Sequence, residues 1–126
     1  MKMTKQQLIA ACAEIMGWRR AHSSWLLSSK PNDLWVIDYE DMKFIKVKDY
    51  NPLENDQQAR ELLEAWCDGI DGRRFTISGR SGFKMVELYE AAYCKQVAMS
   101  SRPHLPTAIC LAVVSAEMGE TVELID

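Results

Sequence analysis

One stretch near the C-terminus constrains the fold of this chain more than any other. Between Pro106 and Gly119, nearly every residue from Thr107 to Met118 is apolar. Proline suits the first turn of a helix, and glycine is common just beyond the last turn. A helix that is apolar all round is buried on all sides. The segment is shorter than the roughly 18 apolar residues that indicate a membrane span, so we expect the central helix of a packed domain.

Two further helices are expected upstream. Thr4 and Gln7 form a capping box, in which each side chain binds a free backbone N–H of the first turn. Gly17 ends this helix, which we place at residues 4–16. A second helix begins near Asn55 or Asp56, with acidic residues where the helix dipole favours them, and ends at one of the glycines near residue 70. The apolar stripes of the two helices are Leu8, Cys12 and Ile15, and Ala59, Leu62, Leu63 and Trp66.

The remaining regular segments have strand composition. Residues 34–39 and 42–47 are rich in aromatic and β-branched residues and form a hairpin around Glu40 and Asp41. Residues 73–78, 83–89 and 93–99 are three more strand candidates, although segment 90–100 can also be read as a short helix. The turn between the first two runs from Gly79 to Gly82. The middle strand is apolar on both sides, which predicts that both of its faces are covered.

These elements predict an α+β domain that spans residues 1–126. Its order is α-β-β-α-β-β-β-α, with an antiparallel sheet packed between helices as in a sandwich. Residues 120–126 form either an edge strand or a loose tail. At 126 residues and 48% hydrophobic residues, the chain can bury a proper core without cross-links.

Charge is distributed unevenly along the chain. The formal net charge is −3, which argues against non-specific nucleic-acid binding as the main activity. Residues 51–72 carry six acidic and one basic side chain, whereas residues 73–104 carry six basic and two acidic ones. Alternating blocks of this kind are most often solvated faces, and they are also where a charged partner binds.

The four cysteines, Cys12, Cys67, Cys94 and Cys110, contain no C-x-x-C pair. The N-terminus has no signal-peptide core, and no stretch approaches the length of a membrane span. We therefore expect reduced thiols, a cytoplasmic location and no membrane partner.

Residues that could perform chemistry do not form a recognisable motif. Cys94 and His104 are the one conceivable thiol–imidazole pair, and nothing in the sequence brings them together. The cysteines and histidines lack the spacing of a zinc site. Acidic residues around the first hairpin are most simply a solvated loop. We expect no catalytic residues, no metal ligands and no cofactor, and hence a protein that is not an enzyme.

Basic residues around the second hairpin are the leading candidate for a partner-binding surface. They are Arg73, Arg74, Arg80, Lys84 and Arg102. A secondary candidate surface combines aromatic and basic residues, namely Trp18, Arg19, Arg20 and Trp25. Helix, three strands and helix is also the order of double-stranded-RNA-binding domains, but the last helix here begins without the lysines that grip phosphates. A protein partner is therefore expected, and a nucleotide or nucleic acid bound through the 73–84 hairpin is the alternative.

Three short motifs resemble a known family. Met16-Gly17-Trp18 closes the first helix, Asn51-Pro52-Leu53 precedes the second, and Leu105-Pro106-Thr107-Ala108-Ile109-Cys110-Leu111-Ala112 opens the last. In this order they resemble the phage ABA sandwich domain family over roughly residues 6–118. The resemblance implies an antiparallel sheet between helices and brings no established activity.

The resemblance also implies a biological setting. It is that of a phage or prophage accessory protein in the cytoplasm of a bacterial host. Such a protein would act without catalysis by binding a host or phage protein, and antagonism of host defence is one form of this. A homodimer is also compatible with the sequence.

Overall fold

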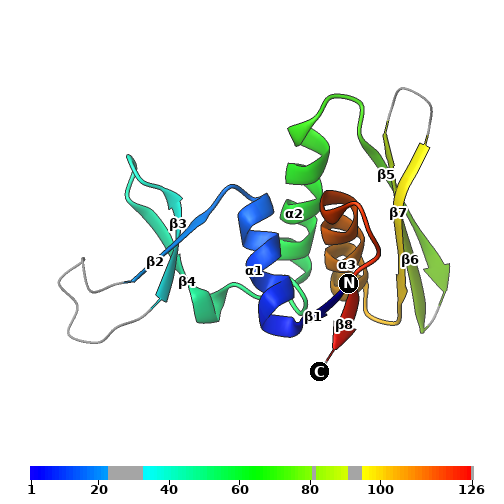
Figure 1. Cartoon of the computed structure of the whole chain (residues 1–126), viewed down its shortest axis with the longest axis horizontal. Helices are drawn as coiled ribbons and strands as arrows, with labels where there is room; N and C mark the ends of the chain where they lie inside the picture. The colour runs from blue at the N-terminus through cyan, green and yellow to red at the C-terminus, as the bar shows by residue number, and fades with distance from the viewer. Residues whose placement is uncertain (23–32, 81, 91–94, 126) are drawn as a thin grey trace.

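The computed structural model describes residues 1–22, 33–80, 82–90 and 95–125. Three helices form a central layer between two antiparallel three-stranded sheets (Figure 1). The helices are α1 (Lys5–Ile15), α2 (Asp56–Gly69) and α3 (Leu105–Met118). One sheet contains β2 (Arg19–His22), β3 (Asp33–Asp38) and β4 (Lys43–Lys46), and the other contains β5 (Arg74–Arg80), β6 (Phe83–Glu90) and β7 (Lys95–Arg102). A short 3-10 helix, η2 (Val47–Asp49), follows β4.

The helix ends follow the local signals in the sequence. The Thr4 hydroxyl accepts a hydrogen bond from the Gln7 backbone N–H at 3.2 Å, and the Gln7 side chain accepts one from the Thr4 N–H at 2.9 Å. The predicted capping box is therefore confirmed. At α2, the Asn55 side chain accepts from the Gln58 N–H at 2.9 Å. Gly119 ends α3 with a left-handed φ of 71°.

α3 is the centre of the molecule, as its apolar sequence predicts. It contacts α1 and α2 on one side and β6 and β7 on the other. Ile109 and Leu111 lie on roughly opposite sides of the helix, about 200° apart, and are 0% and 2% exposed. The Thr107 hydroxyl donates to the Leu53 carbonyl at 3.1 Å and ties the start of α3 to the segment before α2.

The strands add three features to the expected pattern. β2 forms from a segment without clear periodicity, and it pairs antiparallel with β3. β7 is a strand, which settles the choice between strand and helix for residues 95–102. β1 (Lys2–Thr4) and β8 (Glu123–Ile125) pair in parallel, so both ends of the chain lie side by side under the helices (Figure 1). Within the described residues, no helix is long and apolar enough to cross a membrane.

The α+β class with antiparallel sheets is confirmed. The sequence predicts a sheet placed between helices. Here the helices form the middle layer and the sheets lie outside them, so no described helix covers the outer face of the β5–β6–β7 sheet (Figure 1). Val86 and Leu88 of β6 point toward the helices and are fully buried. The alternate side chains of β6, namely Met85, Glu87 and Tyr89, point outward and are only half-buried. Alternation along the strand therefore gives the sheet one packed face and one solvated face.

Candidate functional site

The β5 strand is an edge of its sheet. The strand order is β5-β6-β7, so β5 is hydrogen-bonded to β6 on one side and to no described strand on the other. All seven residues of β5 are exposed. An edge strand presents a row of unpaired backbone N–H and C=O groups that can pair with another chain. We call this free side of β5, with its side chains, the open edge.

Two apolar side chains of β5 remain exposed although they face the helical layer. Phe75 lies opposite Leu88 and Ile77 lies opposite Val86, and cross-strand partners share a face of the sheet. The two β6 residues are buried under α3, but Phe75 and Ile77 are 43% and 37% exposed. The reason is that α3 packs over β6 and β7 and stops short of the sheet edge. The open edge therefore combines free backbone groups with uncovered apolar area.

A glycine determines how the hairpin after β5 closes. Arg80, the last residue of β5, pairs with Phe83, the first residue of β6. Gly79 has a φ of 145°, and a Cβ at this position would lie 2.2 Å from the Phe83 carbonyl oxygen. No other residue fits so close to a backbone oxygen, so glycine is required here.

Three basic residues lie at this end of the sheet, with Arg80 on the opposite face from Lys84 and Arg102. Arg80 ends β5, and Lys84 of β6 lies directly opposite Arg102 of β7. Among the described residues, none of the three forms an ion pair. Like charges directly opposite each other destabilise a sheet. We call Arg80, Lys84 and Arg102 the basic end, and its uncompensated charge favours an anionic group from outside.

The structure separates Arg73 from the other predicted binding residues. Its guanidinium stacks on the Trp66 ring at 4.5 Å from the ring centroid. Its Nη1 donates to the Trp66 carbonyl at 2.9 Å and lies 3.3 Å from Glu117 Oε1. The Arg73 side chain is only 12% exposed. It joins the C-terminal ends of α2 and α3 and contributes to the fold. Arg74 is exposed at the start of β5, about 20 Å from Arg80 at the usual rise per strand residue.

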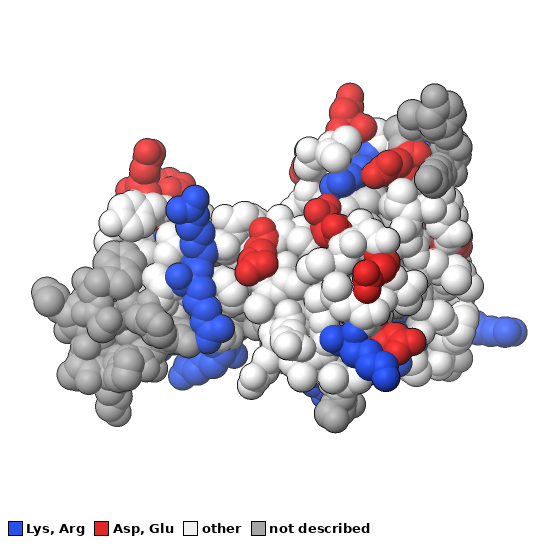
Figure 2. Space-filling view, in the orientation of Figure 1, with Lys and Arg blue, Asp and Glu red and all other residues white. Residues whose placement is uncertain are grey.

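The secondary candidate surface lies on the other side of the helices, at the β2–β3–β4 sheet (Figure 1). Trp18 is half-buried and packs edge-on against the Tyr50 ring, with centroids 4.7 Å apart. Arg20 lies over the Trp35 ring at 5.8 Å, while Arg19 is exposed on the same strand. Trp25 lies outside the described residues. Figure 2 shows Lys and Arg side chains in a row over this side of the molecule.

Among the acidic, histidine and cysteine side chains considered for metal binding or catalysis, Asp38 and His104 contact neighbouring polar or charged groups. Asp38 Oδ1 accepts hydrogen bonds from the Glu40 and Asp41 backbone N–H groups at 3.0 and 3.2 Å and thereby orders the hairpin turn. His104 Nε2 lies 3.6 Å from Glu54 Oε2, and both side chains are largely exposed. Cys94 lies outside the described residues. Within the described part of the chain, no three His, Cys, Asp or Glu side chains gather closely enough to hold a metal ion.

The described cysteines are free thiols in contact with the core. A hydrogen bond with Cys12 and burial raise the pKa of the Cys110 thiol well above its ordinary value. Burial also raises the pKa of Cys67. A thiol with a raised pKa stays protonated at neutral pH and is a poor nucleophile. These two cysteines are therefore suited to packing.

Sequence reasoning found the basic end but missed the apolar part of the open edge. The alternation of Phe75 and Ile77 predicts a strand face, and an apolar strand face is ordinarily buried. Only the position of α3 shows that the cover stops before β5.

Comparison with known proteins gave no relative: no family model, no curated protein and no solved structure matches this chain.

Proposed function

We propose that this protein is a non-enzymatic binding module that takes up an extended, acidic segment of a partner protein as an additional strand on β5. The observation that carries the proposal is the open edge, which is exposed along all seven residues of β5. Proteins ordinarily blunt or cover such an edge. In strand addition, backbone hydrogen bonds supply affinity and the alternating side chains supply specificity.

The side chains of β5 indicate which partner residues fit. Phe75 and Ile77 lie on the helix-side face, so a partner strand gains by placing apolar residues at alternate positions on that face. Burying the exposed part of these two side chains removes apolar area from water. Thr76 and Ser78 point to the outer face, where the partner strand remains in solvent and carries polar residues.

The basic end indicates the charge of the partner. Lys84 and Arg102 oppose each other without an ion pair to a described residue, and a carboxylate placed beside them relieves their repulsion. Two cations on one face of the sheet end and one on the other match one or two acidic side chains. They do not form the continuous basic track that a nucleic-acid backbone requires. The net charge of −3 further favours a protein partner over nucleic acid.

The resemblance to the phage ABA sandwich domain family supplies the proposed setting. In that setting the module works in the cytoplasm of a bacterial host and binds a host or phage protein, with antagonism of host defence as one outcome. A second copy of the same chain is the competing occupant of the open edge, because two β5 strands can also pair with each other.

Capture of partners from bacterial lysate, followed by mass spectrometry, tests the proposal when it is done with matched variants. Ile77→Lys places a charge on the helix-side face of β5, whereas Ser78→Lys places the same charge on the outer face of the same strand. We expect Ile77→Lys to abolish capture and Ser78→Lys to retain it. Lys84→Glu combined with Arg102→Glu should weaken capture, and Lys43→Glu combined with Lys46→Glu on the other sheet should not.

Three results would contradict the proposal. Equal capture by Ile77→Lys and the wild type would show that the open edge is not the binding surface. Capture that is lost after nuclease treatment would identify nucleic acid as the partner. A dimer in light scattering that Ile77→Lys converts to a monomer would assign the open edge to a second copy.

A further inference from the structure

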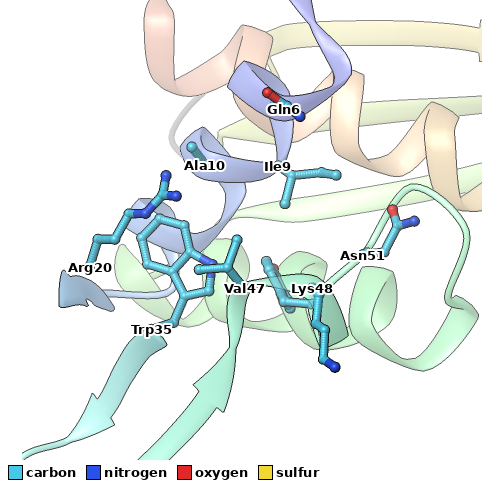
Figure 3. A pocket seen from close by; sticks show the side chains of 9 residues that line it. Gln6, Ile9, Ala10, Arg20, Trp35, Val47, Lys48 and Asn51 are labelled. Carbon is cyan, nitrogen blue, oxygen red and sulfur yellow. The ribbon is translucent and has the colours of Figure 1, made fainter. Parts of the chain in front are cut away.

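A pocket of about 310 Å³ lies between α1 and the β2–β3–β4 sheet. Ile9 and Ala10 of α1 face Trp35 and Val47 across it (Figure 3). The pocket is on the opposite side of the helical layer from the open edge (Figure 1). Its size is at the lower end of the range for small-molecule sites, roughly 300–1,000 Å³. We call it the α1 pocket.

Three residues that line the α1 pocket each have a buried side-chain polar atom without a partner in the described part of the chain. Trp35 Nε1, Tyr50 Oη and Asn51 Oδ1 are buried and have no hydrogen-bond partner among the described residues. The Trp35 and Tyr50 side chains belong to the core and are 3% and 2% exposed. Buried polar groups in folded proteins are nearly always hydrogen-bonded, and each exception calls for an explanation. Three such atoms on residues that line one pocket are groups that a bound molecule can satisfy.

The polar wall is held in place by neighbouring groups. The Asn51 backbone N–H donates to Gln58 Oε1 at 2.7 Å, and Gln58 Nε2 donates to the Asp49 carbonyl at 3.0 Å. These two bonds bracket Tyr50, whose ring also contacts Trp18. Burial raises the pKa of Tyr50, so its hydroxyl stays protonated and can donate. A wall supported in this way is preorganised for a ligand.

The charge at the α1 pocket is positive and lies at one end. Figure 3 shows Arg20 and Asn51 at opposite ends, with the Lys48 ammonium group directed away from the space between them. Arg20 is therefore the cation that faces a ligand, and its planar guanidinium matches a carboxylate. A phosphate group needs more donors than this. The nearby N-terminus of α1 offers few, because Thr4 caps it.

We propose that the α1 pocket binds a small planar aromatic carboxylate that carries a hydroxyl group at the end opposite its carboxylate. The carboxylate pairs with Arg20, and the ring lies between the α1 side chains and Trp35. The hydroxyl group donates to Asn51 Oδ1 and accepts from Tyr50 or Trp35 at the inner end. This assignment gives a partner to Asn51 Oδ1 and to one of Tyr50 Oη and Trp35 Nε1, and it does not depend on the open edge.

Isothermal titration calorimetry with the full chain tests the ligand chemistry. The probes are 4-hydroxybenzoate, with one ring, and 6-hydroxy-2-naphthoate, with two. 2-Naphthoate lacks the hydroxyl group, 2-naphthol lacks the carboxylate, and inorganic phosphate lacks the ring. We expect at least one hydroxy acid to bind about tenfold more tightly than its truncated analogues, because each end contributes a hydrogen bond made in a buried site.

Matched variants test the position of the site. Arg20→Gln should weaken binding of the hydroxy acid about tenfold or more, as expected for loss of a charge-assisted hydrogen bond. Arg19→Gln, with the same charge change on the opposite face of β2, should leave affinity within about twofold. Tyr50→Phe keeps the ring and removes the hydroxyl, and it should weaken binding of the hydroxy acid more than that of 2-naphthoate. Ala10→Phe fills the pocket and should abolish binding, while near-ultraviolet circular dichroism shows that each variant is folded.

The proposal is overturned if neither hydroxy acid binds up to roughly 5 mM. It is equally overturned if Arg20→Gln and Arg19→Gln change affinity to the same extent, or if phosphate alone binds as tightly as the hydroxy acids.

Discussion

Replacing Arg73 with alanine should destabilise the fold, because the structure gives this residue three interactions at the ends of α2 and α3. The hydrogen bond from a charged guanidinium to the Trp66 carbonyl contributes about 1.5–3 kcal/mol. The stacking on the Trp66 ring adds about 0.5–2 kcal/mol. The ion pair with Glu117 adds less than about 1 kcal/mol, because Glu117 is 37% exposed and screened by solvent.

One atom of Arg73 lowers the stability of the native protein. Arg73 Nε is buried without a partner among the described residues, which costs about 1–3 kcal/mol in the native protein. Arg73→Ala removes this cost together with the favourable interactions, so we expect a net loss of about 2 kcal/mol in the free energy of unfolding. Urea denaturation followed by tryptophan fluorescence measures it, and the midpoint should fall by roughly 1 M at unchanged slope.

Matched variants separate the contributions. Glu117→Gln removes only the ion pair and should cost less than about 1 kcal/mol. Arg80→Ala, at the exposed basic end, should change the unfolding free energy by less than about 0.5 kcal/mol. If Arg73→Ala changes the free energy of unfolding as little as Arg80→Ala does, Arg73 does not join the two helices. Arg73 is then again a candidate partner-binding residue.

The core, the hairpin and the thiols give three further predictions. Ile109→Ala and Leu111→Ala should each cost about 2–5 kcal/mol in chemical denaturation, and a neutral result for either would show that α3 is not central. Gly79→Ala should destabilise the β5–β6 hairpin, because its Cβ would meet a backbone carbonyl at 2.2 Å; unchanged amide exchange in β5 and β6 would refute this. Unfolded protein prepared without reductant should show four free thiols on titration. In the native protein Cys110 should resist alkylation near pH 8, since its hydrogen bond with Cys12 and its burial raise its pKa; two or fewer free thiols would contradict the expectation of reduced cysteines.

The helix boundaries and the central helix were predictable from the sequence. A cap such as Thr4 with Gln7, or Gly119 after α3, acts within about four residues of its helix end, so the sequence around it contains all the information. The apolar character of α3 likewise requires burial on every side wherever the helix lies. The weakly periodic segment that became β2 was missed, because its pairing with β3 depends on residues more than ten positions away.

The candidate sites were decided by tertiary structure. Arg73 and Arg80 look alike in sequence, but Arg73 lies against Trp66 and Glu117 while Arg80 stands at a sheet edge. Phe75 and Ile77 have the pattern of buried residues and are exposed only because α3 covers β6 and β7 and not β5. Local sequence determines which conformation a segment prefers, because caps, turns and periodicity act at short range. Which of its faces stays uncovered depends on how distant elements divide a limited amount of apolar surface, and only the assembled fold determines that.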